Sequence, residues 1–157
     1  MLTEYQAYRE SHAATSTGQR LEFWRKSLKF FEAAPVFGHG SGSTKLLFER
    51  DAVGQTGASA EVIANPHNQT LNVAVQLGSV GVILLYLMWI SHLRLFIGKE
   101  GLFAWIGLVA VTQNFFSSLL NSHLFDFTEG WLYVLAVGIA AGMVGRIQPT
   151  IVHAGQA

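Results

Sequence analysis

Three long apolar runs without a single charged residue constrain this chain more than any other feature. An α-helix needs about 20 apolar residues to cross the hydrocarbon core of a bilayer. The first two runs contain 21 and 22 residues, and the third contains 16 before Arg146, whose long side chain can reach the membrane surface. We therefore expect an all-α integral membrane protein with three transmembrane helices, at residues 71–93, 101–122 and 130–147.

The composition of the chain agrees with a membrane protein. Only 13% of its residues are charged, whereas soluble domains approach a quarter. A soluble helical core is the alternative, but three such runs make it the weaker reading. Ten basic and ten acidic residues cancel, which argues against nucleic acid as a partner. The absence of cysteine excludes disulfides, thiolate metal ligands and thiol nucleophiles.

The basic residues of the short connections predict an orientation. Arg94 and Lys99 lie between the first two runs and Arg146 follows the third, whereas residues 121–130 contain no Lys or Arg. The positive-inside rule places these three side chains in the cytoplasm, together with a tail at 148–157. Residues 1–70 then form a loop region outside, which in a bacterium is the periplasm. Seven basic residues in that region do not oppose this, because long segments translocate largely regardless of charge.

Within the outer region we expect an amphipathic helix over about residues 17–34, capped by Ser16 and ended by Pro35. At 100° per residue, one side of this helix is apolar and the opposite side carries the charged residues. The expected apolar side consists of Leu21, Trp24, Leu28 and Phe31, and the expected solvated side of Glu22, Arg25, Lys26, Lys29 and Glu32.

Arg20 departs from this sorting. It projects into the apolar side of the expected helix, one turn from Trp24, where an unpaired guanidinium would be costly. An anionic ligand is therefore expected to meet it. The alternative is that Arg20 turns out to solvent near the helix start or pairs with a loop carboxylate.

Three alternating glycines follow Pro35, at positions 38, 40 and 42. Their backbone N–H groups could surround a phosphate, although a plain turn is the simpler interpretation. The segment is not a Walker A loop, because it has no Gly-Lys-Ser/Thr. His39 within it is a weaker candidate base than His67. Residues 50–60 are rich in small and polar residues, and we expect a mobile loop there.

His67 lies in the run Asn65-Pro66-His67-Asn68, directly before the first apolar run. Asn65 or Asn68 can cap the helix that starts here. An imidazole at a membrane surface can act as a general base near neutral pH, although a purely structural role is the alternative. The histidines of the chain do not have the spacing of zinc ligands, and we expect no metal site.

Taken in order, these motifs resemble the C-terminal part of the O-antigen ligase and O-antigen polymerase (Wzy-type) family over about residues 10–145. The resemblance rests on Ser16-x3-Arg20-x3-Trp24, Pro35-x2-Gly38-x-Gly40-x-Gly42, and Pro66-His67-Asn68 followed by Gly78 and Gly81. Members of this family usually have about a dozen membrane helices. The resemblance therefore implies that this chain is a C-terminal fragment or part of a larger enzyme.

The resemblance implies a GT-C-type glycosyltransferase of the bacterial inner membrane. Such an enzyme transfers a glycan from undecaprenyl diphosphate to a periplasmic acceptor, commonly the lipid A core, without a metal ion or other cofactor. The family's diphosphate-binding arginine and acceptor-activating histidine fall on Arg20 and His67. Trp24, Asn68 and Gly40 would support the site. Asn121, His123 and Asp126, in the outer connection, could close it from the other side or form a hydrated turn.

Two further functions stay open at this point. An O-antigen or exopolysaccharide polymerase, or a protein O-oligosaccharyltransferase, would use the same residues with another glycan or a protein as acceptor. A non-catalytic membrane scaffold or transporter remnant would use Arg20 and His67 only to stabilise the loop. All these readings share membrane lipid as a partner.

Overall fold

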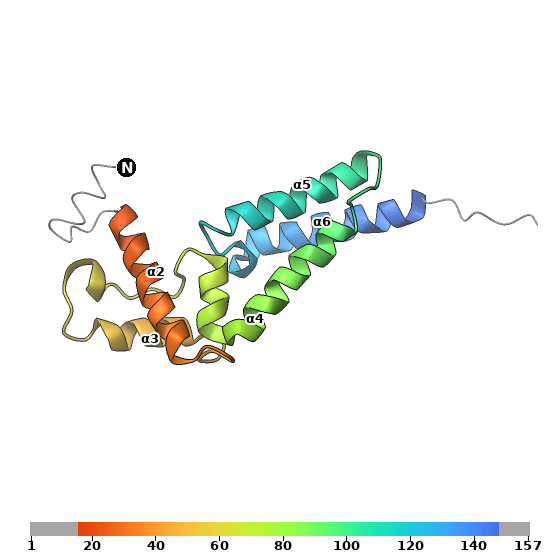
Figure 1. Ribbon diagram of the computed structural model, residues 1–157. Coiled ribbons are helices and arrows are strands. Elements are labelled where there is room, and N and C mark those ends of the chain that lie inside the picture. Colours follow the sequence, from red (N-terminus) through yellow and green to blue (C-terminus); the bar gives the residue numbers. More distant parts are fainter. Residues whose placement is uncertain (1–15, 148–157) are drawn as a thin grey trace, which may run out of the picture.

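The computed structural model describes residues 16–147, which form helices and no strand (Figure 1). The expected tail at 148–157 and the side chain of Ser16 lie outside this description. The helices are α2 (Ser16–Ala33), α3 (Ser43–Ala52), α4 (Gln69–Arg94), α5 (Leu102–Ser117) and α6 (Phe127–Ile147), with 3₁₀ turns η1 (Gly57–Ala60) and η2 (His123–Phe125).

Two of these helices, α4 and α6, are long and apolar enough to cross a membrane. The third apolar helix, α5, has 16 residues, because the chain leaves it after Ser117 and turns back. In this turn the N–H groups of Leu120 and Asn121 both bond to the Ser117 carbonyl. The helix α6 begins at Phe127, earlier than the expected 130, and has 21 residues.

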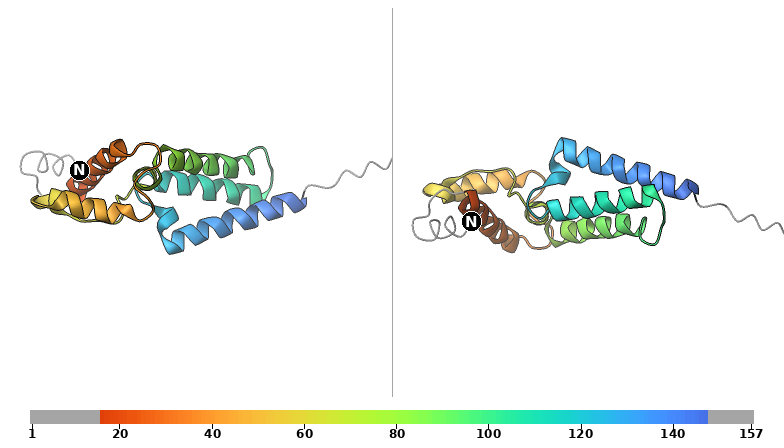
Figure 2. Two further views of the ribbon diagram at one scale, coloured as in Figure 1. Left: turned by 90° about the horizontal axis from the view of Figure 1, so that it is seen from below. Right: turned by 90° about the horizontal axis from the view of Figure 1, so that it is seen from above.

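The long helix α4 is broken at Gly78, whose φ of 63° and ψ of −160° are not helical. Figure 1 shows its two parts running in different directions. Figure 2 shows α2 and α3 gathered at one end of the molecule, while α5, α6 and the second part of α4 extend toward the other. The break therefore joins the part that contains α2, α3 and the first part of α4 to a bundle of three apolar helices. We call the former the outer part, after the location expected for it.

The loop between α2 and α3 satisfies the backbone groups that the break leaves unpaired. In an unbroken helix the N–H groups of residues 79 and 80 would bond to the carbonyls of 75 and 76. Instead, Ser79 and Val80 donate to the carbonyls of Pro35 and Val36, while the Val75 and Gln76 carbonyls accept from His39 and Gly40. All four groups are paired, as a break in a membrane protein requires.

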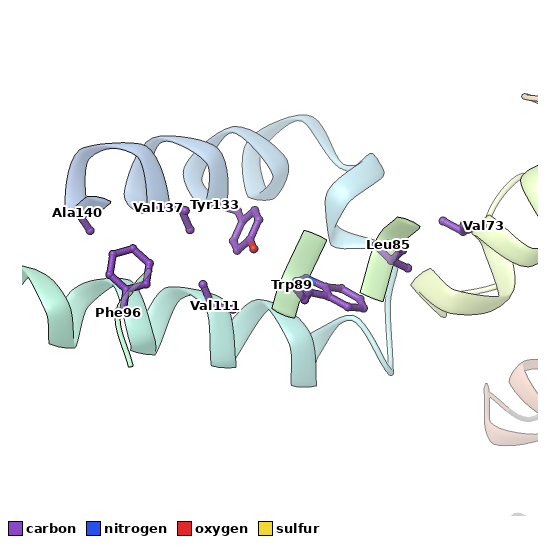
Figure 3. Packing of buried hydrophobic residues seen from close by; sticks show 8 residues of the cluster. All are labelled: Val73, Leu85, Trp89, Phe96, Val111, Tyr133, Val137 and Ala140. Atoms are coloured by element: carbon purple, nitrogen blue, oxygen red, sulfur yellow. The ribbon is translucent and has the colours of Figure 1, made fainter. Parts of the chain in front are cut away.

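Each part of the structure has its own apolar core. In the outer part, Phe23, Phe30, Phe48 and Val75 pack together from α2, α3 and the first part of α4. In the bundle, Trp89 of α4 donates a hydrogen bond to Asn114 of α5 (Nε1–Oδ1 3.0 Å) and packs edge-on against Phe115. Figure 3 shows the buried residues of this second core: Val73, Leu85, Trp89, Phe96, Val111, Tyr133, Val137 and Ala140.

The buried side of α2 differs from the expected one. Lys26, expected in solvent, is 1% exposed, and Leu28, expected inside, is 50% exposed. Lys26 can be buried because its ammonium pairs with Asp51 of α3 (2.9 Å) and donates to the Ser59 carbonyl. Its partners lie in residues 50–60. We expected a mobile loop there, but this segment contains the end of α3 and the 3₁₀ turn η1.

Candidate functional site

His67 lies in the connection that leads into α4 and has an unusual backbone. Its φ is 55°, and no other described residue except glycine has a positive φ. Its N–H donates to Asn65 Oδ1 (2.9 Å), and the preceding Pro66 carbonyl accepts from Trp24 Nε1 (3.0 Å). Such a left-handed conformation costs free energy and persists only where neighbouring groups enforce it, which is common at functional sites.

Asn68 caps α4, which settles the choice between Asn65 and Asn68. Its Oδ1 accepts from the N–H of Leu71 (3.0 Å), and its Nδ2 donates to the Leu119 carbonyl (2.9 Å). Asn65 instead accepts from the Ser122 hydroxyl (2.7 Å). Hydrogen bonds therefore hold the residues around His67 against the connection between α5 and α6, more than 50 positions later in the sequence.

The contacts of the His67 ring indicate its tautomer. Nδ1 lies 3.2 Å from Asn121 Oδ1. The same Asn121 atom accepts from the backbone N–H of Ser122 (2.9 Å), which identifies it as oxygen rather than nitrogen. Nδ1 must then carry the proton, and Nε2 keeps a lone pair. Asn121 therefore contacts His67, and the closure of a site by this connection stays a prediction.

Arg20 does not lie where the helix pattern placed it. Its side chain is exposed, and no hydrogen bond or ion pair joins it to another residue of 16–147. The desolvation cost that demanded an anionic partner does not arise. Arg20 lies one turn before Trp24 on α2, and Trp24 contacts Pro66. A role in binding the donor stays a prediction.

The alternating glycines form a turn and not a phosphate-binding loop. The N–H groups of Gly38, Gly40 and Gly42 bond to the Ala34 carbonyl, the Gln76 carbonyl and Gln76 Oε1. None of these three groups is left to bind a phosphate. Gly40 thus supports the structure near the break in α4. His39 is also engaged, because its Nε2 bonds to the Phe30 carbonyl (2.7 Å).

A group of possible metal ligands lies at the start of α6. Ligand atoms of His123, Asp126 and Glu129 all lie within 4.8 Å of one another. From the sequence we named His123 and Asp126 as possible site residues but not as metal ligands, because the spacing of this group is not that of zinc ligands. Asp126 and Glu129 also lie where carboxylates favour a helix N-terminus, so the group has a structural explanation without a metal.

Residues 2–86 match the family model described as O-antigen ligase. This chain belongs to the O-antigen ligase family. The match includes Arg20, Trp24, Gly40, His67 and Asn68 and ends within α4. No curated protein matches the chain. Membership indicates a membrane protein with an O-antigen ligase- or polymerase-type function, whose partners in general are a lipid-linked glycan and a glycan acceptor.

Proposed function

We propose that this chain forms part of a GT-C-type O-antigen ligase of the bacterial inner membrane. It would transfer a glycan from undecaprenyl diphosphate to the lipid A core in the periplasm, without a metal ion. The observation that carries the proposal is the His67 ring, which Asn121 orients and which keeps a lone pair on Nε2. Family membership supplies the reaction class.

His67 acts on the acceptor in this mechanism. A hydroxyl of the acceptor attacks the anomeric carbon of the donor sugar, forming a C–O bond as the bond to the diphosphate oxygen breaks. Nε2 accepts the hydroxyl proton as the bond forms. The ring becomes a cation, and Asn121 Oδ1 stabilises it by accepting the Nδ1 hydrogen bond.

Arg20 acts on the leaving group. The departing lipid diphosphate gains negative charge, which a guanidinium can stabilise through two parallel hydrogen bonds. Support comes from the exposure of Arg20 and from the absence of a competing partner among residues 16–147. Because His67 takes the proton and Arg20 meets the charge, no step of the proposed reaction requires a metal ion.

The helix ends around His67 support a site at a membrane surface. The start of α4 meets the end of α5 through the bond from the Gln69 N–H to the Ser118 carbonyl (2.9 Å). Gln69 Oε1 also accepts from the N–H of Leu124, just before α6 (3.0 Å). We place this end of the bundle in the periplasm and the Arg94–Lys99 connection in the cytoplasm.

The test replaces the corresponding segment of a full-length O-antigen ligase with this chain and assays ligated O-antigen on lipopolysaccharide gels. His67→Ala should lower transfer roughly 100-fold or more, because a general base commonly contributes that much. Arg20→Ala should also abolish visible ligation. His39→Ala and Arg50→Ala, which alter exposed residues outside the proposed chemistry, are the matched controls. Normal ligation in both site variants, with normal membrane insertion, would refute the mechanism.

A further inference from the structure

A polar cavity of about 350 Å³ is lined by Asn65, whose side chain accepts a hydrogen bond from the His67 N–H, and has no part in the mechanism above. Its walls come from four separate segments: the start of α3, residues 64–65, the first part of α4, and the connection before α6. Sites for small molecules begin at roughly this volume and carry a few fixed polar groups. The cavity is therefore large enough for one ligand unit.

Three buried polar side chains, Thr44, Asn72 and Gln76, form a fixed network at this cavity. The N–H of Gly42 donates to Gln76 Oε1 (2.6 Å), so the other end of that amide is nitrogen. This nitrogen donates to Asn72 Oδ1 (2.8 Å), and the Thr44 hydroxyl donates to the same oxygen (3.2 Å). A backbone N–H thus fixes the orientation of both amides.

The network leaves one strong donor unused. Asn72 is 3% exposed, yet no acceptor among residues 16–147 engages its Nδ2. This nitrogen is not completely enclosed by protein atoms, so solvent or a ligand can reach it. A ligand oxygen that fills the cavity could therefore accept a hydrogen bond from this N–H in place of water.

The rim of the cavity indicates the chemistry of that ligand. Lys45 and Asp126 bring charges of opposite sign, which favours neither an anion nor a cation. Phe125, 54% exposed, adds an apolar ring face. A neutral sugar ring matches this combination, because its hydroxyls donate and accept hydrogen bonds while its C–H groups pack on an aromatic face.

Asn65 connects the cavity to the proposed catalytic base. Its side chain lines the cavity, and its Oδ1 accepts from the backbone N–H of His67 (2.9 Å). We propose that the cavity bounded by Asn72, Gln76 and Phe125 binds one sugar unit of the glycan substrate beside His67. This assignment rests on the proposed function, since transfer to a glycan acceptor is what places a sugar next to the base.

The proposal is tested on the 157-residue chain in detergent micelles by saturation-transfer NMR with the methyl glycosides of glucose, galactose and N-acetylglucosamine. At least one glycoside should receive saturation. Phe125→Ala should weaken its binding roughly tenfold, because an aromatic contact contributes about that factor. Phe125→Tyr should retain binding. Phe127→Ala, which removes a neighbouring ring that is 82% exposed and lies outside the cavity, should have no effect.

Saturation of none of the glycosides, or equal binding by the Phe125→Ala and Phe127→Ala variants, would overturn the proposal. Displacement of the glycoside by inorganic phosphate at millimolar concentration would also overturn it, since the cavity would then be an anion site. This experiment measures sugar binding and is independent of glycan transfer. If the chain binds a glycoside but the His67→Ala ligase still transfers glycan, only the proposed base is refuted. If His67→Ala abolishes transfer but the chain binds no glycoside, only the cavity assignment is refuted.

Discussion

At the scale of single residues, the hydrogen bond between His67 and Asn121 predicts how much each side chain contributes to the rate of glycan transfer. Asn121 touches no reacting atom in the proposed mechanism, so it is a positioning residue. Asn121→Ala should lower transfer in the chimeric ligase by roughly 10-fold, less than His67→Ala, because the base remains but its orientation is lost. The measurement is the transfer rate over a pH series.

The conservative variant Asn121→Asp separates positioning from a merely structural role. It keeps an acceptor for Nδ1 but adds a carboxylate, which favours the protonated ring. The rate should therefore begin to fall at a higher pH on acidification than in the parent enzyme. An unchanged pH profile in the aspartate variant, together with full activity of Asn121→Ala, would exclude Asn121 from the site.

Asp51 predicts a pH dependence of stability in the outer part. The hydrogen bond from Lys29 (2.6 Å), aided by Lys26, holds the pKa of Asp51 below its ordinary value. A lowered carboxyl pKa stabilises the fold above the unfolded value of about 4 and loses this contribution as pH falls through the folded pKa. Stability should thus decline on acidification below about pH 4, and Asp51→Asn should flatten that decline in thermal unfolding followed by circular dichroism.

At the scale of elements, the break in α4 depends on two glycines in contact with opposite segments. A Cβ at Gly78 would collide with the Val36 backbone, and one at Gly38 would collide with the Gln76 backbone. Gly78→Ala should therefore destabilise the protein by more than 2 kcal/mol, about the cost of a left-handed backbone plus a steric clash. The measurement is the thermal unfolding midpoint in detergent.

Gly54→Ala is the matched control for this prediction. Gly54 also has a positive φ, of 77°, but open space surrounds the position of its Cβ. It should incur only the backbone cost, roughly 1–2 kcal/mol. Equal destabilisation by the two variants would show that the contact between the loop and the break contributes nothing.

The sequence predicted the helical elements better than their contacts. Apolar runs and the stop at Pro35 indicate helices wherever the chain is strongly patterned. The helix α3 was missed because its large apolar residues form one short block, Leu46 to Phe48, rather than a stripe at helical spacing, and no side chain caps its start. The buried side of α2 was misjudged because the partner of Lys26 is supplied by α3, 25 positions later.

One signal for the cavity was present in the sequence. Gln69, Asn72 and Gln76 recur at helical spacing in an otherwise apolar segment, so they share one side of α4. Buried amides on one side of a membrane-associated helix indicate a polar lining, and two of the three, Asn72 and Gln76, do line the cavity. What the spacing could not supply is the partner surface, which comes from α3 and from the connection before α6.

At the scale of the whole molecule, the candidate site lies at the interface between the outer part and the apolar bundle. His67 comes from the outer part, whereas Asn121 and Phe125 belong to the connection of the bundle helices α5 and α6. The sequence placed His67 next to a membrane helix but could not show which later connection would meet it. Long-range proximity of this kind depends on how α5 and α6 return, which no local pattern encodes.

This arrangement also predicts the topology of the chain in the membrane. Because the chain lacks cysteine, a single cysteine can report the side on which a residue lies. Thr56→Cys, in the outer part, should react with a membrane-impermeant maleimide in intact spheroplasts. Glu100→Cys, between α4 and α5, should react only after permeabilisation, because Arg94 and Lys99 favour the cytoplasmic side. The reverse pattern would place His67 in the cytoplasm, away from a periplasmic acceptor.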